Sequence, residues 1–301
     1  MTVPITGTWF VSPTPFTPDG AVDVASIHTL VDAAVDWGVD GVTGLGVMGE
    51  ATALTDDERS VVQEAFVAAS AGRIPVAVGC SAASAAVTAS RVAAAVASGA
   101  AAVMVSAPTL ARDTDLIGRF YATATKGAGV PVIVQDEPAA TGVRLPVSAL
   151  VAALDATGST IVKLEDPPTP PKISRLLAVR PGLTVFGGLG GVNALWELRN
   201  GGAGTMTGFA FPEILRALRV RHEAGDRAGA AAVFDRYLPY IAYEGQTVVG
   251  LPIRKEVLRL RGAIACARTR DGAPLDDDTI AELHDVLARV GLSATREPVT
   301  A

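Results

Sequence analysis

The sequence predicts a (β/α)8 barrel, also called a TIM barrel, with a C-terminal helical extension. Eight short and mostly apolar runs recur between residues 8 and 208, which indicates parallel strands that are buried on both faces. Alanine-rich helical stretches separate these runs, as the alternating pattern of an α/β fold requires. A doubly wound sheet is the alternative. However, the first run is followed by "SPTPFTPDG", which lacks the glycine-rich nucleotide loop usual in that fold.

The predicted strands and helices follow one another in a regular order. The helix after the second strand opens with Thr55 as N-cap and Glu58 three residues later, a capping box, and ends at Gly72. The next helix ends at Gly99 in the same way. The predicted strands are 8–11, 41–46, 74–79, 101–106, 130–135, 160–165, 183–188 and 203–208.

The chain continues well past its eighth strand. Three further stretches, beginning near residues 212, 248 and 275, have helical patterns. We therefore expect a barrel over residues 1–224 and a helical extension over 225–301. Because no low-complexity linker separates the two, we expect them to pack as one structural unit.

Composition and charge exclude several classes of function. Twenty-five basic residues against 31 acidic ones give a net charge of −6, which does not favour nucleic-acid binding. The apolar stretches are too short to cross a membrane, and the start of the chain lacks the features of a signal peptide. Cys80 and Cys266 lie far apart, so we expect a reduced cytoplasmic protein. The three histidines form no ligand cluster, and we expect neither a metal nor a cofactor.

Lys163 stands out in the run "IVKLEDPP" (161–168) because a lysine among β-branched residues is costly to bury as an ammonium. Side chains alternate along a strand, so Lys163 and Glu165 share one face. Two interpretations stay open. Desolvation favours a neutral amine, which is the nucleophile needed to condense with a ketone. Alternatively, Lys163 forms a structural ion pair with Glu165 or Asp166.

Glycine-rich turns follow the second and seventh predicted strands. In "GLGVMGE" (44–50), exposed backbone N–H groups are suited to cradle a carboxylate, although a tight turn between strand and helix is an equally ordinary reason for the glycines. "GGLGG" (187–191), which includes Gly188, allows a ligand to approach the backbone closely. Gly208 ends the eighth strand at the same rim.

In this order, these segments resemble the dihydrodipicolinate synthase / N-acetylneuraminate lyase family of class I aldolases. The resemblance runs over residues 7 to 293. The segments that carry it are "PTPFTPDGAVD", "GVDGVTGLGVMGEATALTDDER", "EPAATG", "IVKLED" and "GLPIRKEVLRLRG".

The resemblance implies a Schiff base between Lys163 and a 2-oxo acid such as pyruvate, without a cofactor. It places the carboxylate of that acid on the glycine loop, and it implies a homodimer or homotetramer. The residues that we expect to bind substrate are Gly46, Val47, Met48, Gly49, Glu50, Asp136, Thr141, Gly188 and Gly208.

The chain departs from the family pattern at several positions. Gln135 occupies the position of the family's proton-relaying tyrosine, and glutamine cannot transfer protons as a phenol does. Val47 and Met48 replace two hydroxyl residues, and Ala140 replaces the arginine that would hold a second carboxylate. The tyrosine of the loop after the fourth strand is missing from "APTLARD" (107–113). We expect Glu165 to take over acid–base catalysis, and Glu50 to bond the backbone of its own loop.

The predicted function is therefore a Schiff-base-forming lyase, either an aldolase or a hydro-lyase, that acts on a 2-oxo acid. One alternative is a degenerate barrel that binds a metabolite without turnover, which the missing tyrosine favours. Another is a true 4-hydroxy-tetrahydrodipicolinate synthase, which the missing arginine and tyrosines argue against. A metal-dependent class II aldolase is disfavoured because no histidine–carboxylate ligand set appears at the strand ends.

Overall fold

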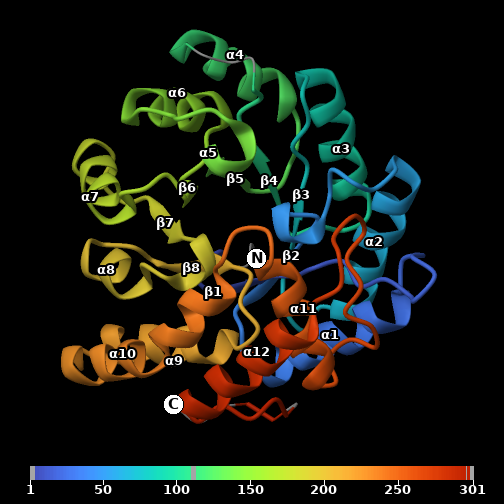
Figure 1. The fold of residues 1–301 in the computed structure, drawn as a ribbon. Helices are drawn as coiled ribbons and strands as arrows, with labels where there is room; N and C mark the ends of the chain where they lie inside the picture. The colour runs from blue at the N-terminus through green and yellow to red at the C-terminus, as the bar shows by residue number, and fades with distance from the viewer. Residues whose placement is uncertain (1–3, 110–112, 296, 299–301) are drawn as a thin grey trace.

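The computed structural model describes residues 4–109, 113–295, 297 and 298. Eight parallel strands close into a barrel in chain order, with β1 paired to both β2 and β8, which confirms the predicted fold class (Figure 1). The strands are β1 (Gly7–Val11), β2 (Gly41–Gly44), β3 (Val76–Gly79), β4 (Ala102–Ser106), β5 (Val132–Asp136), β6 (Ile161–Leu164), β7 (Thr184–Gly187) and β8 (Gly204–Thr207).

Helices surround the barrel, and two short 3-10 turns lie in the loops at its mouth. The helical elements are α1 (Val24–Asp36), η1 (Val47–Gly49), α2 (Asp56–Ser70), α3 (Ala85–Ala97), α4 (Thr114–Ala124), α5 (Pro138–Thr141), α6 (Val147–Thr157), α7 (Thr169–Val179), η2 (Leu189–Gly191), α8 (Ala194–Arg199), α9 (Pro212–Glu223), α10 (Arg227–Glu244), α11 (Gly250–Leu260) and α12 (Asp277–Val290).

The predicted ends of two helices are close to the observed ones. Thr55 and Glu58 form the capping box at the start of α2, each side chain accepting from the other's backbone N–H. The last residues of α2 and α3 precede Gly72 and Gly99 by two residues. Both glycines have positive φ, at +75° and +94°, which is the left-handed conformation that commonly ends a helix.

The inside of the barrel is filled by its own hydrophobic core. Its large members include Trp9, Met104, Ile133, Phe186 and Met206, and the rings of Trp9 and Phe186 meet edge to face at 6.5 Å. A separate and larger core lies between the strands and the surrounding helices. Because side chains fill the barrel interior, a ligand site must lie at one end of the barrel, and active sites of this fold lie at the C-terminal ends of the strands.

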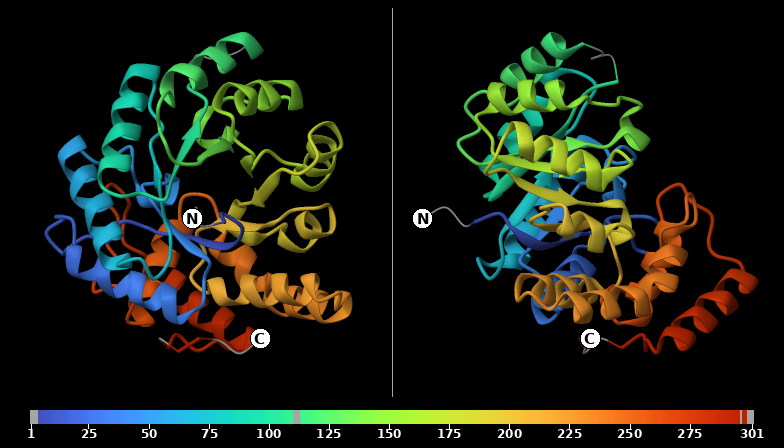
Figure 2. Two further views of the ribbon diagram at one scale, coloured as in Figure 1. Left: turned by 180° about the vertical axis from the view of Figure 1, so that it is seen from behind. Right: turned by 90° about the vertical axis from the view of Figure 1, so that its left-hand side faces the viewer.

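The three helices of the extension pack beside one end of the barrel (Figure 2, right). Helix α10 packs along α9, and α12 packs on α10. Helix α11 brings residues of the extension to the barrel mouth. The predicted boundary at residue 224 falls directly after α9, and the division into two segments stays a prediction. Within the described residues, no helix has the length and apolarity that a membrane crossing requires.

Candidate active site at the barrel mouth

Lys163 projects from β6 into the mouth of the barrel. Its register neighbours are Gln135 on β5 and Phe186 on β7, and Ile161, two residues earlier on the same face, belongs to the inner core. The side chain is buried, yet it lines a cavity of about 540 Å³, here called the main cavity. A ligand in this cavity would therefore have access to the lysine amine.

Glu165 is the immediate partner of Lys163. Lys163 Nζ lies 2.6 Å from Glu165 Oε2, and both side chains are almost fully buried. Leu189 N–H reaches Oε1 of the same carboxylate at 3.4 Å. The lysine thus forms the ion pair of one sequence interpretation while facing the open cavity that the other interpretation requires.

Gln135 connects the Lys163–Glu165 pair to Ser106 on β4. Its Nε2 donates to Glu165 Oε2 at 2.9 Å, and its Oε1 accepts from Ser106 Oγ at 3.4 Å. The hydroxyls of Ser106 and Ser81 are 2.9 Å apart. At the position where the resemblance expects a phenol, this chain therefore holds an amide that contacts the Glu165 carboxylate.

Glu137 is a further carboxylate on the wall of the main cavity. It caps the short helix α5, with Oε2 accepting from Ala140 N at 2.5 Å. Burial raises the pKa of Glu137, and the neighbouring charge of Glu165 raises it further. The sequence analysis gave Glu137 no role of its own.

The glycine loop, residues 46–50, contains the 3-10 turn η1, with Gly46 before the turn and Glu50 after it. Gly46 and Val47 line the second of two cavities at the mouth, and Val47 and Met48 line the main one. Gly49 supports the turn, since its carbonyl accepts from Thr14 Oγ1 at 2.6 Å. The first N–H groups of a helical turn lack partners within the turn, so the start of η1 can receive an anion.

Glu50 does not line either cavity. Its Oε1 pairs with Lys255 Nζ, and its Oε2 accepts from the Arg270 backbone N–H at 2.6 Å. Burial lowers the pKa of Lys255, and the charge of Glu50 opposes this effect. The structure therefore places Glu50 as the link between the loop and the extension. The expectation that it bonds the backbone of its own loop is wrong.

Asp136 points away from the mouth, between the barrel and α7. Its Oδ2 accepts from Lys172 Nζ at 2.5 Å, and the same nitrogen donates to Asp166 at 2.9 Å. Burial raises the pKa of Asp136 to about 6 despite the contact with Lys172. Strand β5 includes Asp136, so alternation turns it opposite to Gln135. The structure does not bring it to either cavity.

Of the remaining predicted substrate-binding residues, Gly208 and Thr141 line a cavity, whereas Gly188 supports the site from behind. Gly208 lines the main cavity, and Thr141 lines the second one while bonding the Glu137 carbonyl and the Val143 N–H. Gly188 lines neither cavity. A Cβ at Gly188 would lie 2.2 Å from Glu165 Oε1, so this glycine makes room for the carboxylate.

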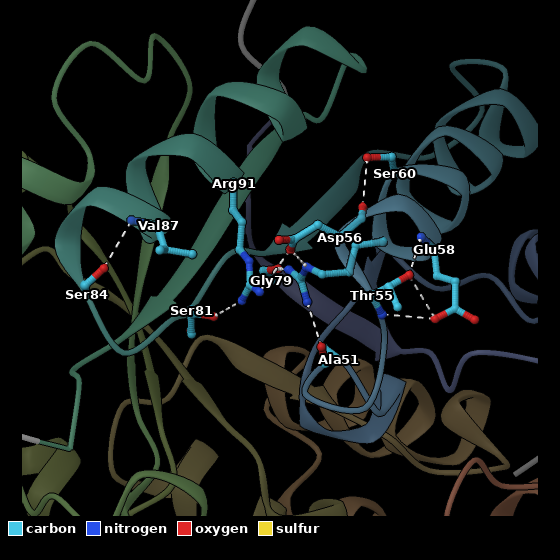
Figure 3. A network of polar contacts seen from close by, with 11 residues as sticks. Ala51, Thr55, Asp56, Glu58, Ser60, Gly79, Ser81, Ser84, Val87 and Arg91 are labelled. Atoms are coloured by element: carbon cyan, nitrogen blue, oxygen red, sulfur yellow. Dashed lines mark hydrogen bonds and ion pairs between the residues drawn. The ribbon is translucent and has the colours of Figure 1, made fainter.

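The second cavity measures about 320 Å³ and lies over β2 to β5, with Val47 and Ala140 on the wall of both cavities. Its outer wall is held by the network in Figure 3, where Arg91 joins Ser81 to Asp56. Beside it, Arg59 donates to the carbonyls of Ala51 and Gly79 at 3.0 and 2.7 Å.

Arg254 on α11 is a site residue that sequence reasoning missed. It is only 4% exposed and lines the main cavity, with Nε donating to Glu244 Oε1 at 2.5 Å. The signal lay in the helix pattern. Ile253, Val257 and Leu258 mark the buried side of α11, and Arg254 falls on that side.

Two further points bear on the sequence predictions. Residues 110–112 of the "APTLARD" loop lie outside the described residues, so the position of the missing tyrosine is not seen. In the part of the chain that is described, no group of three or more histidine, cysteine or carboxylate side chains is arranged to hold a metal ion.

The fold and this site define a class of protein: a (β/α)8 lyase of the class I aldolase type. Comparison with known sequences agrees, since the dihydrodipicolinate synthetase family matches residues 5–290. The chain belongs to that family and is a lyase of this type.

Relatives within the family differ in their reactions. L-2-keto-3-deoxyarabonate dehydratase of Azospirillum brasilense is 34% identical over 293 residues, which cover 94% of each chain. 4-Hydroxy-tetrahydrodipicolinate synthase of Xanthomonas axonopodis pv. citri (strain 306) is 32% identical over 249 residues, 80% of each chain. Among solved structures, dihydrodipicolinate synthase from Rhodopseudomonas palustris superposes with a TM-score of 0.90 at 33% identity, covering 96% of this chain and 99% of the other.

Proposed function

We propose that the chain is a hydro-lyase that removes water from a 2-oxo-3-deoxy sugar acid bound to Lys163 as a Schiff base. The observation that carries the proposal is the contact between Lys163, Glu165 and Gln135 beside the main cavity. It supplies an amine and an adjacent base without the tyrosine of the family pattern. The dehydratase relative, similar over nearly its whole length, supports the same reaction type.

The first half of the proposed reaction forms the Schiff base. Transfer of a proton from Lys163 to Glu165, across 2.6 Å, gives a neutral amine. The amine attacks C2 of the 2-oxo acid. The former carbonyl oxygen leaves as water with the proton from Glu165, so a protonated imine and a carboxylate remain.

The second half removes water from the substrate. The protonated imine at C2 accepts the electron pair of the adjacent C3–H bond, so Glu165 can take the C3 proton and an enamine forms. The enamine then expels the C4 hydroxyl, which departs as water with the proton held by Glu165. Addition of water to the resulting unsaturated imine releases the dehydrated 2-oxo acid and restores Lys163 and Glu165.

Ala140, which replaces the arginine of the family pattern, favours a hydroxylated substrate over that of the synthase. Ala140 stands at the position where the family resemblance expects an arginine, and it lies on the wall of both cavities. Serine and threonine side chains of the second cavity can instead donate to and accept from hydroxyl groups.

Trapping the Schiff base tests the proposal. Borohydride reduction in the presence of pyruvate should attach the three-carbon acid to the peptide that contains Lys163, as read by mass spectrometry. Lys163→Ala should abolish trapping, whereas Lys126→Ala, which removes an exposed lysine, should leave it unchanged. No adduct with the folded protein would refute the proposal.

Turnover distinguishes the alternatives. Loss of water from 2-oxo-3-deoxy pentonates or hexonates, followed by mass spectrometry, supports the hydro-lyase. Consumption of pyruvate with aspartate semialdehyde would identify a synthase instead. Thermal stabilisation by a metabolite that persists in Lys163→Ala, without turnover, would identify a binding protein.

We also propose a cytoplasmic homodimer or homotetramer. Cys80 and Cys266 are both free thiols, which is consistent with a reducing compartment. Light scattering on the purified protein would show its mass in solution, and a monomer at working concentrations would contradict the assembly.

A further inference from the structure

We infer that Arg254 binds the carboxylate of the 2-oxo acid whose C2 reacts with Lys163. This inference rests on the proposed function and adds a charged binding residue to it. It assigns to the extension a task that the family pattern gives to hydroxyl groups of the glycine loop. The evidence is the position of the guanidinium, its anchorage and the space around it.

The glycine loop has lost the side chains that would hold a carboxylate. Val47 and Met48 stand where the resemblance expects two hydroxyl residues, and their side chains carry no strong donor. Backbone N–H groups at the start of η1 remain available. A carboxylate here would therefore lack the side-chain donors unless another element supplies them.

Arg254 reaches this place from α11. Its Nη1 contacts Met48 Sδ, so the guanidinium lies against the loop itself. Met48 and Arg254 line the same cavity as Lys163. A planar guanidinium donates along two edges and is well matched to a carboxylate.

Gly208 leaves the space that Arg254 occupies. A Cβ at residue 208 would lie 2.6 Å from Arg254 Nη1 and 3.0 Å from Met48 Cγ. The close approach of the arginine to the loop therefore depends on a glycine at the end of β8. We interpret the glycine as part of the same binding arrangement.

Glu244 holds the guanidinium of Arg254 in place through a contact with its Nε. Glu244 accepts from Arg254 Nε at 2.5 Å, from Tyr240 Oη at 2.7 Å and from the Ala210 N–H. These contacts fix a buried carboxylate behind the arginine. Among the described residues, Arg254 donates to Glu244 through Nε and contacts Met48 through Nη1, and we assign Nη2 to the bound carboxylate.

The test compares carbonyl compounds with and without a carboxylate. Borohydride trapping on Lys163 is measured against the concentration of pyruvate and of methyl pyruvate, its uncharged ester. Arg254→Met should raise the pyruvate concentration for half-maximal trapping by about tenfold to a hundredfold, the range expected for a lost hydrogen bond to a charged group. The concentration of methyl pyruvate for half-maximal trapping should change less than about threefold in the same variant.

Further variants separate binding from folding. Arg254→Met with Glu244→Gln removes both members of the pair, so no charge is left buried alone. Gly208→Ala keeps both but displaces the guanidinium. Each should show the same selective loss of pyruvate trapping. Arg259→Met on the exposed side of α11, where Arg259 pairs with Glu256, is the matched control and should trap both compounds as the wild type does.

The outcomes are distinguishable. Wild-type protein that traps neither compound would overturn the proposed function itself. Wild-type trapping together with an equal loss for pyruvate and methyl pyruvate in the variants would overturn the role of Arg254 alone. A loss confined to 2-oxo-3-deoxy sugar acids, with pyruvate unaffected, would also overturn it, because the arginine would then bind the hydroxylated tail.

Discussion

The two cavities at the barrel mouth differ in charge. The main cavity, over β6 to β8 and α11, is lined by Lys163, Glu165, Glu137, Glu244 and Arg254. The second cavity, over β2 to β5, has Arg59 as its charged residue and is otherwise lined by small, apolar or hydroxyl side chains and by the amide of Gln135. In the main cavity the charges lie within reach of a ligand, whereas Arg59 uses its donors on backbone carbonyls.

This difference indicates that the groups able to exchange protons or hold an anion lie in the main cavity, whereas the second cavity mainly sets the space available to the substrate. Charged groups that touch one another can exchange protons and hold an anion, which requires that they sit together on one side. Small and hydroxyl side chains leave room and bind uncharged polar groups. We therefore expect substitutions in the main cavity to change reaction rates. Substitutions in the second cavity should change stability or substrate preference, except at Gln135 and Ser106, which lead to Glu165 and should act on the rate.

Glu165→Gln should have the largest effect. The amide keeps the shape but cannot take a proton, so kcat for dehydration should fall by about a hundredfold to a thousandfold. Pyruvate trapping on Lys163 should survive in part, because an amine remains. Steady-state rates and borohydride trapping on the same preparation check this. Unchanged kcat would show that the base lies elsewhere, with Glu137 the next residue to replace.

Arg59→Met should act on stability. The substitution leaves the buried carbonyl of Gly79 without its donor, which costs about 1–3 kcal/mol in the free energy of unfolding. Thermal unfolding should therefore begin a few degrees earlier. We expect KM and kcat to change little. A large fall in kcat with normal stability would contradict this division between the two cavities.

Glu197→Gln should change the pH dependence of stability. Burial raises the pKa of Glu197, behind β7, to about 7 from its ordinary value near 4.5. The native state therefore keeps a proton that the unfolded chain releases, and stability is lost as the pH rises through this window. Glutamine keeps a neutral group at this position and should flatten the decline. Denaturant titrations between about pH 4.5 and 7 test it, and an identical slope in both proteins would refute the assignment.

Ser106→Ala should have the smallest effect. Ser106 reaches Gln135 through a long contact of 3.4 Å, so its loss should lower kcat by less than about threefold. The matched comparison is Gln135→Leu, which removes the 2.9 Å contact to Glu165 and should lower kcat by about tenfold. If Ser106→Ala proves the more damaging of the two, the serine hydroxyls take part in proton transfer.

The sequence was sufficient to predict the barrel and the position of Lys163 at its mouth, because both depend on local patterns. Continuous apolar runs give the strands, and a lysine within one of them is a rare event that alternation places on the same face as Glu165. The prediction for Asp136 was wrong because the predicted strand was one residue too short. The predicted strand ended at Gln135, whereas β5 includes Asp136 and turns its side chain outward.

Long-range partners were beyond the reach of the pattern. Glu50 pairs with a lysine 205 positions away, and Arg254 meets Met48 across 206 positions. Such contacts depend on how α11 packs at the mouth, which no local spacing encodes. The segment "GLPIRKEV" did carry a resemblance to the family, but only the structure shows that its arginine faces the cavity.

The attachment of the glycine loop to α11 also has a consequence for synthesis of the protein. A nascent chain that has emerged only through β8 already contains Lys163 and Glu165, yet Arg254 and Lys255 are still to be translated. The amine that we propose to react would exist before the arginine that we propose to bind the carboxylate. Enzymatic competence should therefore arise only after the ribosome has passed residue 255, and a stop codon before α11 should leave a barrel sequence without a working enzyme.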